Sequence, residues 1–512
     1  MSRLKFILYF FFLIPFFLEG TPAQIKTLYN SLDPKSVSQH LAFYQLYPNS
    51  EEGRKALSLA WKLLSGNAHS FDDAIQQLPY LTSTLNTLIN LINRQPQEET
   101  PQLNESELKL VEHLAQNLPN RKLKGHQAKS EAEVLALTTE EIDLARGLFL
   151  SQFETTGDVL SKIRSYEALL DLMALQILAR TPLQTPPEDK IQAINAFVFE
   201  EMGFRFPPHS LYAKDIDLYT FLPSVLDSRR GVCLGVSILY ICLAQRLNLP
   251  LEMITPPGHI YVRYREGNRI INIETTARGI DLDSEDYLGI DTRSLQQRNV
   301  KEVIGLAHFN QASVFWKQED YPKALQAYQK ALPYLPNDML LRELLAFSFL
   351  LGGFKEKGES LLKQVKNHLP DYSVSSENMA EDYLNGAVDI EGINAIFLHV
   401  DETRESIIKK RQTLEKAISR FPKFRSGYFN LAITWLQLHR EREALECLKT
   451  YHTLDPNDCT AEYYLAVLLA KRLDYNKSWE HLRQAETLVH QRKHEPKILK
   501  HLRKELSQLC PE

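Results

Sequence analysis

The stretch DSRRGVCLGVSILYICLAQRLNLP, residues 227–250, predicts a loop that turns at Gly231 into an amphipathic helix with Cys233 in its first turn. Unpaired backbone N–H groups and the positive end of the helix dipole stabilise a thiolate there, and the same amides can stabilise the oxyanion of a tetrahedral intermediate. Arg229 and Arg230 would add to this effect if they fold close to the thiol. Taken alone, a cysteine in such a helix is more often a small buried core residue than a nucleophile.

Three segments after this helix predict β-strands, over residues 251–254, 256–264 and 269–274. Gly267 and Asn268 have the composition of a two-residue hairpin turn between the second and third strands. With these two residues as the turn, the numbers of paired residues sum to 535. The sequence therefore predicts an antiparallel hairpin in this register.

The predicted register brings an acidic residue toward His259. Tyr261 lies opposite Glu274 in the hairpin. His259 lies opposite Thr276 and is diagonal to Glu274, within reach of a long side chain. Asn272 shares this face but lies further from the histidine. Glu274 is therefore the better candidate to orient the imidazole.

Cysteine, histidine and a carboxylate in this order suit covalent acyl transfer. A Cys233 thiolate attacks an acyl carbon, the His259 imidazole takes and returns a proton, and the Glu274 carboxylate fixes the imidazole tautomer. A lone histidine on a strand is usually structural, and so is a glutamate at a strand end. The order Cys, His and acid, with a helix followed by adjacent strands, is much less common by chance. We therefore predict these three residues as the catalytic set.

Motifs around the three residues resemble the transglutaminase-like superfamily of papain-type Cys-His-acid enzymes. The motifs are DSRRG at 227–231, GVC at 231–233, LNLP at 247–250 and PGHIYVR at 257–263, followed by the acidic third strand. The first and last of them are similar to the SirB-type branch, in which tetratricopeptide repeats commonly follow. The resemblance covers roughly residues 160–290 and implies an α+β catalytic fold with Cys233 as nucleophile, His259 as base and Glu274 in the third position.

This chain departs from the family pattern at two positions, so two functions are considered for it. Many SirB-type members carry proline where this chain has Cys233, and the third position is usually Asp rather than the longer Glu274. One function is an exported cysteine-dependent acyl-transfer enzyme, which hydrolyses or transamidates an amide through a Cys thioester. The alternative is a non-catalytic interaction scaffold that combines a transglutaminase-like domain with repeats.

A spacing of 34 residues recurs in the C-terminal part of the chain. Pro336 recurs as Pro370, and Pro422 recurs as Pro456. Small residues keep the same step at Ala312 and Ala346, Ala324 and Gly358, Ala432 and Ala466, and Ala444 and Ser478. This spacing resembles tetratricopeptide repeats, which present a concave surface. We therefore expect a peptide or protein partner in the repeat groove.

The composition excludes several other classes of protein. The chain has 512 residues, with 59 Lys and Arg against 64 Asp and Glu, a net charge of -5 and a pI near 6.3. Nucleic acids require a basic surface, so no nucleic-acid partner is expected. Five cysteines exclude a disulfide scaffold. Because no phosphate-binding or dinucleotide glycine motif and no His-Glu-x-x-His or paired Cys-x-x-Cys spacing occurs, we predict no metal and no cofactor.

The first 23 residues have the order of a secretory signal peptide. Arg3 and Lys5 precede 13 uncharged residues, from Phe6 to Leu18, and small residues follow before a cut after Ala23. The apolar run is too short to cross a bilayer, although an uncleaved anchor is the alternative. We expect an exported protein, periplasmic or secreted, that meets the membrane only through its signal peptide.

Overall, we expect an α+β protein with a helical N-terminal region, a central transglutaminase-like domain and a C-terminal α-solenoid of tetratricopeptide-like repeats. The expected parts are a signal peptide at 1–23, the helical region at 24–156, the central domain at 157–295, repeats at 301–372, an insertion at 373–410, repeats at 411–492 and a capping helix at 493–512.

Overall fold

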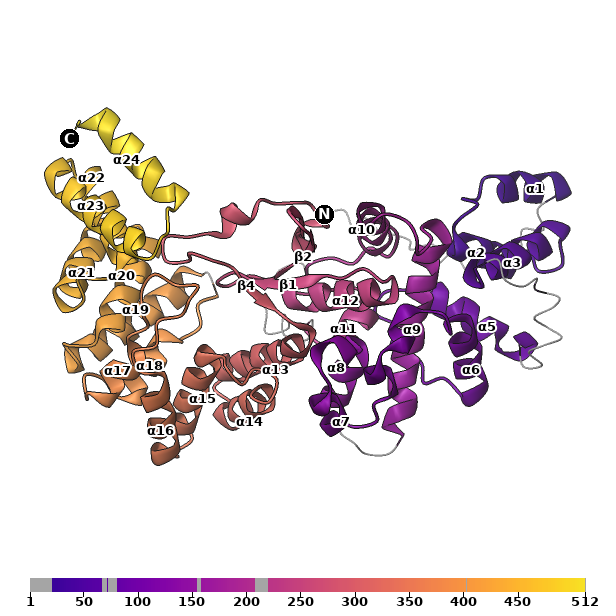
Figure 1. Ribbon diagram of the computed structural model, residues 1–512, viewed down its shortest axis with the longest axis horizontal. Coiled ribbons are helices and arrows are strands. Elements are labelled where there is room, and N and C mark those ends of the chain that lie inside the picture. The colour runs from indigo at the N-terminus through magenta and orange to yellow at the C-terminus, as the bar shows by residue number, and fades with distance from the viewer. Residues whose placement is uncertain are drawn as a thin grey trace, which may run out of the picture.

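The computed structural model describes residues 21–66, 71, 81–153, 158–207, 220–401 and 403–511. The molecule is elongated, with N-terminal helices at one end, a small sheet near the middle and C-terminal helices at the other end (Figure 1). This arrangement confirms the expected α+β class with helical regions on both sides of a mixed domain. Residues 1–20 of the predicted signal peptide lie outside the described residues. Within the described ranges, no helix combines the length and the apolar character needed to cross a membrane.

The N-terminal region consists of short helices, as expected. They are α1 (Pro22–Asn30), α2 (Val37–Leu46), α3 (Glu51–Leu64), α5 (Leu81–Ile92), α6 (Glu105–Leu114), α7 (Glu131–Ala136) and α8 (Leu144–Gln152), with the 3-10 turns η1 (Pro119–Lys122), η2 (Lys124–Gln127) and η3 (Thr139–Glu141). In α3, the buried Ala56, Ala60 and Leu64 follow the helical spacing of the sequence. The polar stretch 93–101 separates α5 from α6, where the sequence predicts a break.

One buried helix organises the central domain. The helices here are α9 (Val159–Arg180), α10 (Pro187–Asn195), the π-turn η4 (Ala196–Glu201), α11 (Leu222–Ser228) and α12 (Cys233–Arg246). Helix α12 packs against α8, α9 and α11, and also against strand β2 (Tyr261–Glu266) and the 3-10 turn η7 (Thr275–Ala277). Every residue of α12 from Leu234 to Ala244 is buried. Cys233, at the N-terminal end, remains partly exposed.

The sheet is antiparallel and has the predicted hairpin at one edge. Its strands are β1 (Glu252–Thr255), β2, β3 (Arg269–Ile273) and β4 (Gln296–Arg298), in the order β3-β2-β1-β4. Val262 pairs with Ile273, and Glu266 pairs with Arg269, so the register summing to 535 is confirmed. Gly267 turns the hairpin with a φ of 57°, which glycine adopts without strain.

Two strand limits predicted from the sequence are wrong. The second strand begins at Tyr261 rather than at Pro256, because two prolines without N–H groups and Gly258, with a φ of 72°, form a turn there. The third strand ends at Ile273, so Glu274 leaves the sheet and caps η7. Strand β4 was not predicted, because its three polar residues carry no alternation signal.

The C-terminal region consists of antiparallel helix pairs. The helices are α13 (Val300–Lys317) with α14 (Tyr321–Ala331), α15 (Met339–Leu351) with α16 (Lys355–Val365), α17 (Met379–Leu384), α18 (Ile390–Ile396), α19 (Arg404–Arg420), α20 (Arg425–Gln437) with α21 (Glu441–Leu454), α22 (Cys459–Lys471) with α23 (Tyr475–Gln491), and α24 (Lys497–Leu509). A Cβ at Gly358 would lie 2.6 Å from the Leu350 side chain, so the small residue is needed for close helix approach. The expected boundary at residue 410 falls inside α19.

Residues 289–293 form a linker between the central domain and both series of helix pairs. Asp291 accepts a backbone hydrogen bond from Val374 (2.8 Å), and Arg293 donates one to Tyr372 (2.9 Å). The imidazole of His494 hydrogen-bonds the Gly289 carbonyl (2.8 Å) just before α24. Figure 1 shows this segment reaching from the sheet to the C-terminal helices. The linker is therefore held by hydrogen bonds to the segment before α17 and to the segment before α24.

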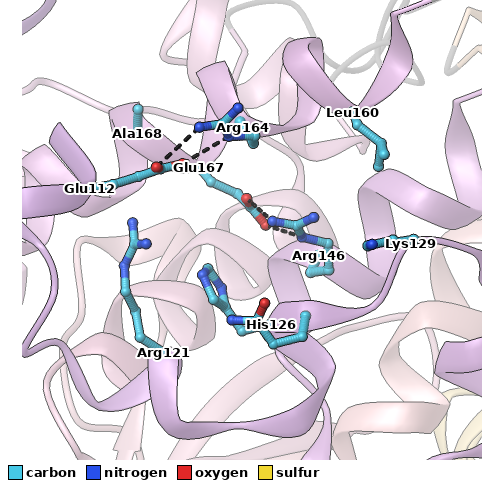
Figure 2. Close-up of a pocket in the computed structure, with 10 residues that line it drawn as sticks. Glu112, Arg121, His126, Lys129, Arg146, Leu160, Arg164, Glu167 and Ala168 are labelled. Atoms are coloured by element: carbon cyan, nitrogen blue, oxygen red, sulfur yellow. Dashed lines mark hydrogen bonds and ion pairs between the residues drawn. The ribbon is translucent and has the colours of Figure 1, made fainter. Parts of the chain in front are cut away.

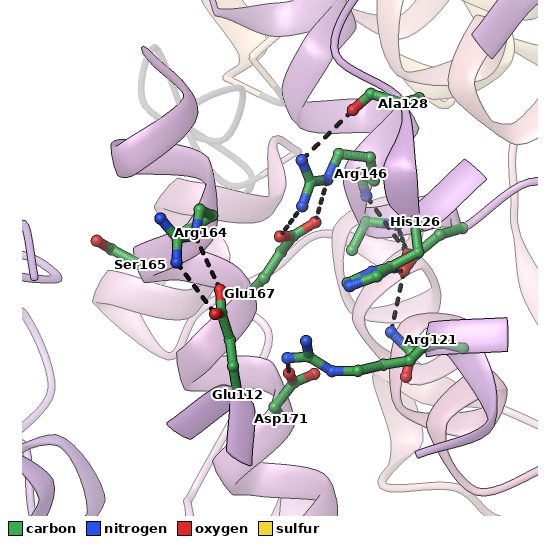
Figure 3. A network of polar contacts seen from close by, with 12 residues as sticks. Glu112, Arg121, His126, Ala128, Arg146, Arg164, Ser165, Glu167 and Asp171 are labelled. Carbon is green, nitrogen blue, oxygen red and sulfur yellow. Dashed lines mark hydrogen bonds and ion pairs between the residues drawn. The ribbon is translucent and has the colours of Figure 1, made fainter. Parts of the chain in front are cut away.

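Buried ion pairs connect the N-terminal helices to α12. Asp171 on α9 accepts from Arg246 at the end of α12 (2.7 Å) and from Arg121 in η1. The Asp171 and Arg246 side chains are both fully buried. Nearby, Arg146 on α8 makes a two-pronged contact with Glu167 on α9 at 2.6 and 2.5 Å (Figure 3). These charges fix η1, α8, α9 and α12 relative to one another.

Replacement of Asp171 by asparagine is expected to lower the free energy of unfolding by about 3–5 kcal/mol, because two arginines lose their buried counter-charge. Urea denaturation followed by circular dichroism measures the change. Lys55→Gln serves as the control, since the Glu51–Lys55 pair is exposed and its loss should leave the midpoint unchanged. Equal midpoints for the two variants would contradict this role of Asp171.

Candidate functional site

The N-terminus of α12 is open toward the thiol of Cys233. Val232 precedes the helix in an extended conformation and provides no side-chain cap. The first backbone hydrogen bond of the helix runs from Val236 to the Val232 carbonyl (3.0 Å). The amides of Cys233, Leu234 and Gly235 therefore precede the helical ladder, and their N–H groups belong to the positive end of the helix dipole.

The loop before Cys233 is held in place by close packing. A Cβ on Gly231 would lie 2.5 Å from the side chain of Val236, so no larger residue fits without movement. The Gly231 amide donates to the Arg205 carbonyl (3.1 Å), and the Arg205 amide donates to the Arg229 carbonyl (3.1 Å). Glycine in the GVC motif is thus explained by the close approach of this loop to its own helix.

Asp227 connects the same loop to the N-terminal helical region. Its carboxylate accepts hydrogen bonds from the Arg94 guanidinium (2.8 Å), the Thr100 hydroxyl (2.6 Å) and the Tyr166 hydroxyl (2.8 Å). The Thr100 amide donates to the same carboxylate (3.0 Å). The aspartate of the DSRRG motif is therefore a positioning residue, and sequence reasoning missed its partners more than 60 residues away.

The sequence suggests that Arg229 and Arg230 stabilise a Cys233 thiolate if they fold close to it, but Arg229 makes other contacts. This residue adopts a left-handed conformation with a φ of 53° at the end of α11. Its guanidinium donates to the backbone carbonyls of Met202 (3.2 Å) and Arg94. Arg229 thus holds the loop to neighbouring backbone, and in the described residues neither it nor Arg230 makes a hydrogen bond with Cys233.

The structure brings the three predicted site residues together. Nε2 of His259 lies 2.6 Å from Oε2 of Glu274. Cys233 lies close enough to the imidazole to raise its pKa. Since Glu274 occupies Nε2, Nδ1 is the nitrogen available to the thiol. The diagonal contact between His259 and Glu274 predicted from the hairpin is therefore present, although both residues lie just outside the strands.

Glu274 is held as a carboxylate by four donors. Besides His259, its oxygens accept from the Thr276 hydroxyl (2.6 Å), the Thr276 amide (3.1 Å) and the Tyr287 hydroxyl (2.6 Å). Burial alone would raise the pKa of Glu274, but the hydrogen bonds from His259, Thr276 and Tyr287 lower it to about 2. The residue therefore stays ionised near neutral pH.

His259 is favoured in its protonated form. Its hydrogen bonds with Cys233 and then with Glu274 raise the pKa of the imidazole to about 9, against a lesser lowering by burial. The ring of Tyr287 stacks on the imidazole, with centroids 5.7 Å apart and planes 12° apart. An imidazolium therefore lies beside Cys233 in this site.

Tyr287 is the residue of the site that sequence reasoning missed. It ends the 3-10 turn η8 (Ser284–Tyr287), which lies in the long connection after β3. Its ring also stacks on Tyr261, with centroids 4.8 Å apart. No strand or helix pattern marks this connection, so no sequence signal placed Tyr287 near the imidazole.

Asn272, the weaker candidate for the third position, has a structural role. Its side chain accepts from Arg263 (2.9 Å) and donates to the Leu282 carbonyl (2.6 Å). The first contact joins the two strands of the hairpin, and the second holds the connection after β3 against it. The preference for Glu274 over Asn272 is therefore consistent with the observed contacts.

The other thiols lie in different surroundings. All five cysteines are free thiols. Burial raises the pKa of Cys447 to about 11 and that of Cys459 to about 12. Cys242 is fully buried within α12. Among the described cysteines, Cys233 is the one that raises the pKa of a neighbouring imidazole.

A polar cavity of about 330 Å³ lies between the N-terminal helices and α9, away from the three predicted site residues (Figure 2). It is lined by Glu112, Arg121, His126, Gln127, Lys129, Arg146, Leu160, Arg164, Glu167 and Ala168. The carboxylates of Glu112 and Glu167 already accept two hydrogen bonds each, from Arg164 and Arg146. None of the three triad residues lines this cavity, and its charges are largely paired with one another.

Comparison with known proteins matches the middle of the chain to a family. A family profile described as "Transglutaminase-like superfamily" matches residues 164–304. Mouse F-box only protein 21 is 31% identical over 137 residues, which cover 27% of this chain and 20% of that protein. A UPF0162 protein of Xylella fastidiosa (strain Temecula1) is 29% identical over 162 residues, covering 29% of this chain and 57% of that protein. The chain thus spans about a fifth of the F-box proteins and just over half of the bacterial protein.

Several solved structures are similar to parts of this chain at low identity. MamA is 12% identical with a TM-score of 0.21, covering 36% of this chain and 96% of that chain. YrrB, described as a TPR protein with an unusual peptide-binding site, is 15% identical with a TM-score of 0.21, covering 39% and 92%. Because these values are low, the helix pairs of the C-terminal region are established by this chain's own structure. The profile match identifies residues 164–304 as a transglutaminase-like domain.

Proposed function

We propose that the protein is a cysteine-dependent acyl-transfer enzyme whose nucleophile is Cys233. The observation that carries this proposal is the position of His259, whose Nε2 lies 2.6 Å from the Glu274 carboxylate and whose pKa is raised by the neighbouring Cys233. A structural histidine needs only one partner, whereas acyl transfer needs a base between a nucleophile and an orienting acid.

The reaction follows from these contacts. The Cys233 thiolate attacks the acyl carbon of an amide, and the oxyanion that forms accepts hydrogen bonds from first-turn amides of α12. His259 gives its proton to the leaving amine, and a thioester remains on the sulfur. Water or a second amine then attacks the thioester while His259 removes its proton. The thiolate is restored, and the product is a carboxylic acid or a new amide.

The C-terminal helix pairs provide the proposed substrate-binding part. Ala312, Ala346, Ala432 and Ala466 are fully buried, as the 34-residue pattern requires where two helices approach closely. Stacked helix pairs present an extended surface that suits a peptide or protein. We therefore propose a polypeptide substrate, and export of the protein under its predicted signal peptide, to the periplasm or the exterior of the cell.

Alkylation should distinguish Cys233 from the other thiols. We expect iodoacetamide at pH 6 to label Cys233 at least tenfold faster than Cys447 or Cys459, because a thiolate beside an imidazolium reacts well below the usual thiol pKa. Mass spectrometry of the peptides after timed quenching measures the three rates in the same sample. Replacement of His259 by alanine should remove the advantage of Cys233.

His501→Ala is the matched control for this experiment, since His501 is exposed on α24. This variant should label like the unchanged protein. Labelling of Cys233 no faster than of Cys447 would overturn the enzymatic proposal. The alternative, a binding scaffold formed by the C-terminal helix pairs on a catalytically silent domain, would then be favoured.

Replacement of Tyr287 by phenylalanine tests whether its hydroxyl positions the triad. The ring stack on His259 is kept, while Glu274 loses one hydrogen bond, so its pKa should rise and its hold on the imidazole should weaken. We expect labelling of Cys233 at pH 6 to slow by roughly 3- to 10-fold, which corresponds to the net contribution of one typical hydrogen bond.

The pH profile separates this effect from a loss of folding. In Tyr287→Phe, the acidic limb of the Cys233 labelling profile should move to higher pH while the unfolding midpoint stays unchanged. Tyr463→Phe on α22 provides the distant control. An unchanged profile would show that the hydroxyl does not act on the triad.

A further inference from the structure

Three side chains meet at a buried carboxylate between the last C-terminal helices. Glu462 on α22 is fully buried. One of its oxygens lies 2.5 Å from Nδ1 of His452 on α21, and the other lies 2.7 Å from Nδ1 of His481 on α23. The two imidazole rings stand nearly perpendicular, with centroids 5.3 Å apart. Three consecutive helices thus each contribute one side chain to the cluster.

The charge of Glu462 has no permanent counter-charge. Among the described residues, its ion pairs are with these two histidines, and no lysine or arginine pairs with it. A buried carboxylate is costly unless it is paired or binds a metal. Both histidines remain partly exposed, with 34% and 20% of the side chains of His452 and His481 accessible. A solute cation can therefore reach the cluster from one side.

We propose that His452, Glu462 and His481 bind a Zn²⁺ ion. Each offers one ligand atom, and these three atoms lie within 4.8 Å of one another. Two imidazole nitrogens and one carboxylate oxygen are ligands that zinc takes in proteins, with water in the fourth tetrahedral position. The ion replaces the two hydrogen bonds, so each Nδ1 gives its lone pair to the metal and each ring carries its hydrogen on Nε2.

Comparison with a second cluster of possible metal ligands shows why the Glu462 cluster is the better candidate. His126, Asp143 and Glu167 also lie within reach of a common ion. There, however, Arg146 already neutralises Glu167 with two hydrogen bonds (Figure 3). Asp143 is held by Asn120 and caps α8. The cluster at Glu462 has no such permanent cation and is open to solvent.

Bound zinc would connect α21, α22 and α23 at one point. These helices carry the second series of 34-residue units and pack in order along the chain. The spacings between the ligands are 10 residues (452 to 462) and 19 residues (462 to 481). They match no short metal motif, which is why no metal was predicted from the sequence. The site is far along the chain from Cys233 and acts independently of it.

Zinc titration of the full chain tests the proposal. The experiment uses Cys233→Ala protein, because a cysteine beside a histidine can itself bind zinc. Isothermal titration should give one site of micromolar or tighter affinity. Glu462→Gln and His481→Gln should each weaken it more than tenfold. His490→Gln is the matched control, since His490 is exposed on α23, and should leave affinity unchanged.

Cobalt provides a readout that needs no variant of the cluster. Co²⁺ added to the Cys233→Ala chain should give visible d–d bands of a tetrahedral site without a thiolate charge-transfer band, because the ligands are nitrogen and oxygen. Zn²⁺ should abolish these bands at one equivalent. Absence of the bands, presence of a thiolate band, or equal loss of zinc affinity in His490→Gln would each overturn the assignment.

Discussion

Burial of α12 on all sides is the constraint on which the rest of the domain depends. The residues from Leu234 to Ala244 contact helices and the sheet, so the helix cannot rotate or slide without opening the core. Its C-terminal end is fixed as well, by the ion pair between Arg246 and Asp171. At its N-terminal end the helix meets solvent, and Cys233 lies there. The position of the thiol is thus a consequence of packing rather than of local loop structure.

The N-terminal helical region contributes to the site through Asp227. Arg94 and Thr100 come from the connection between α5 and α6, and Tyr166 comes from α9. All three donate to one carboxylate six residues before Cys233. Deletion of the N-terminal helices would remove Arg94 and Thr100 from this carboxylate and leave Tyr166 as its donor. The region therefore helps to hold the loop before Cys233 in place.

The sequence predicted those features that depend on short-range patterns. The hairpin register followed from a turn of two residues, Gly267 and Asn268, and it was correct because the turn sets every pairing in it. The 34-residue spacing predicted the helix pairs, because close packing demands small residues such as Gly358 at fixed steps. The α+β class followed from these two patterns together.

Features set by long-range packing were missed or misplaced. Tyr287 reaches His259 from an irregular connection, and strand β4 pairs with β1 about 40 residues later, so neither leaves a periodic signal. The cluster at Glu462 joins side chains of three helices that come together only when the helix pairs stack. The sequence predicts strand for the turn residues before Tyr261, although the prolines there cannot donate ladder hydrogen bonds.

The length of the acid at position 274 follows from the place where β3 ends. Glu274 leaves the sheet after Ile273, and its backbone already bonds Ile280 and begins η7. From there one carboxylate oxygen accepts from Thr276 in the same turn, while the other reaches His259 and Tyr287. An aspartate would be one methylene shorter and would have to give up either the cap of η7 or the contact with the imidazole. Glutamate satisfies both, so the departure from the usual aspartate is compensated by the local fold and preserves the geometry that acyl transfer needs.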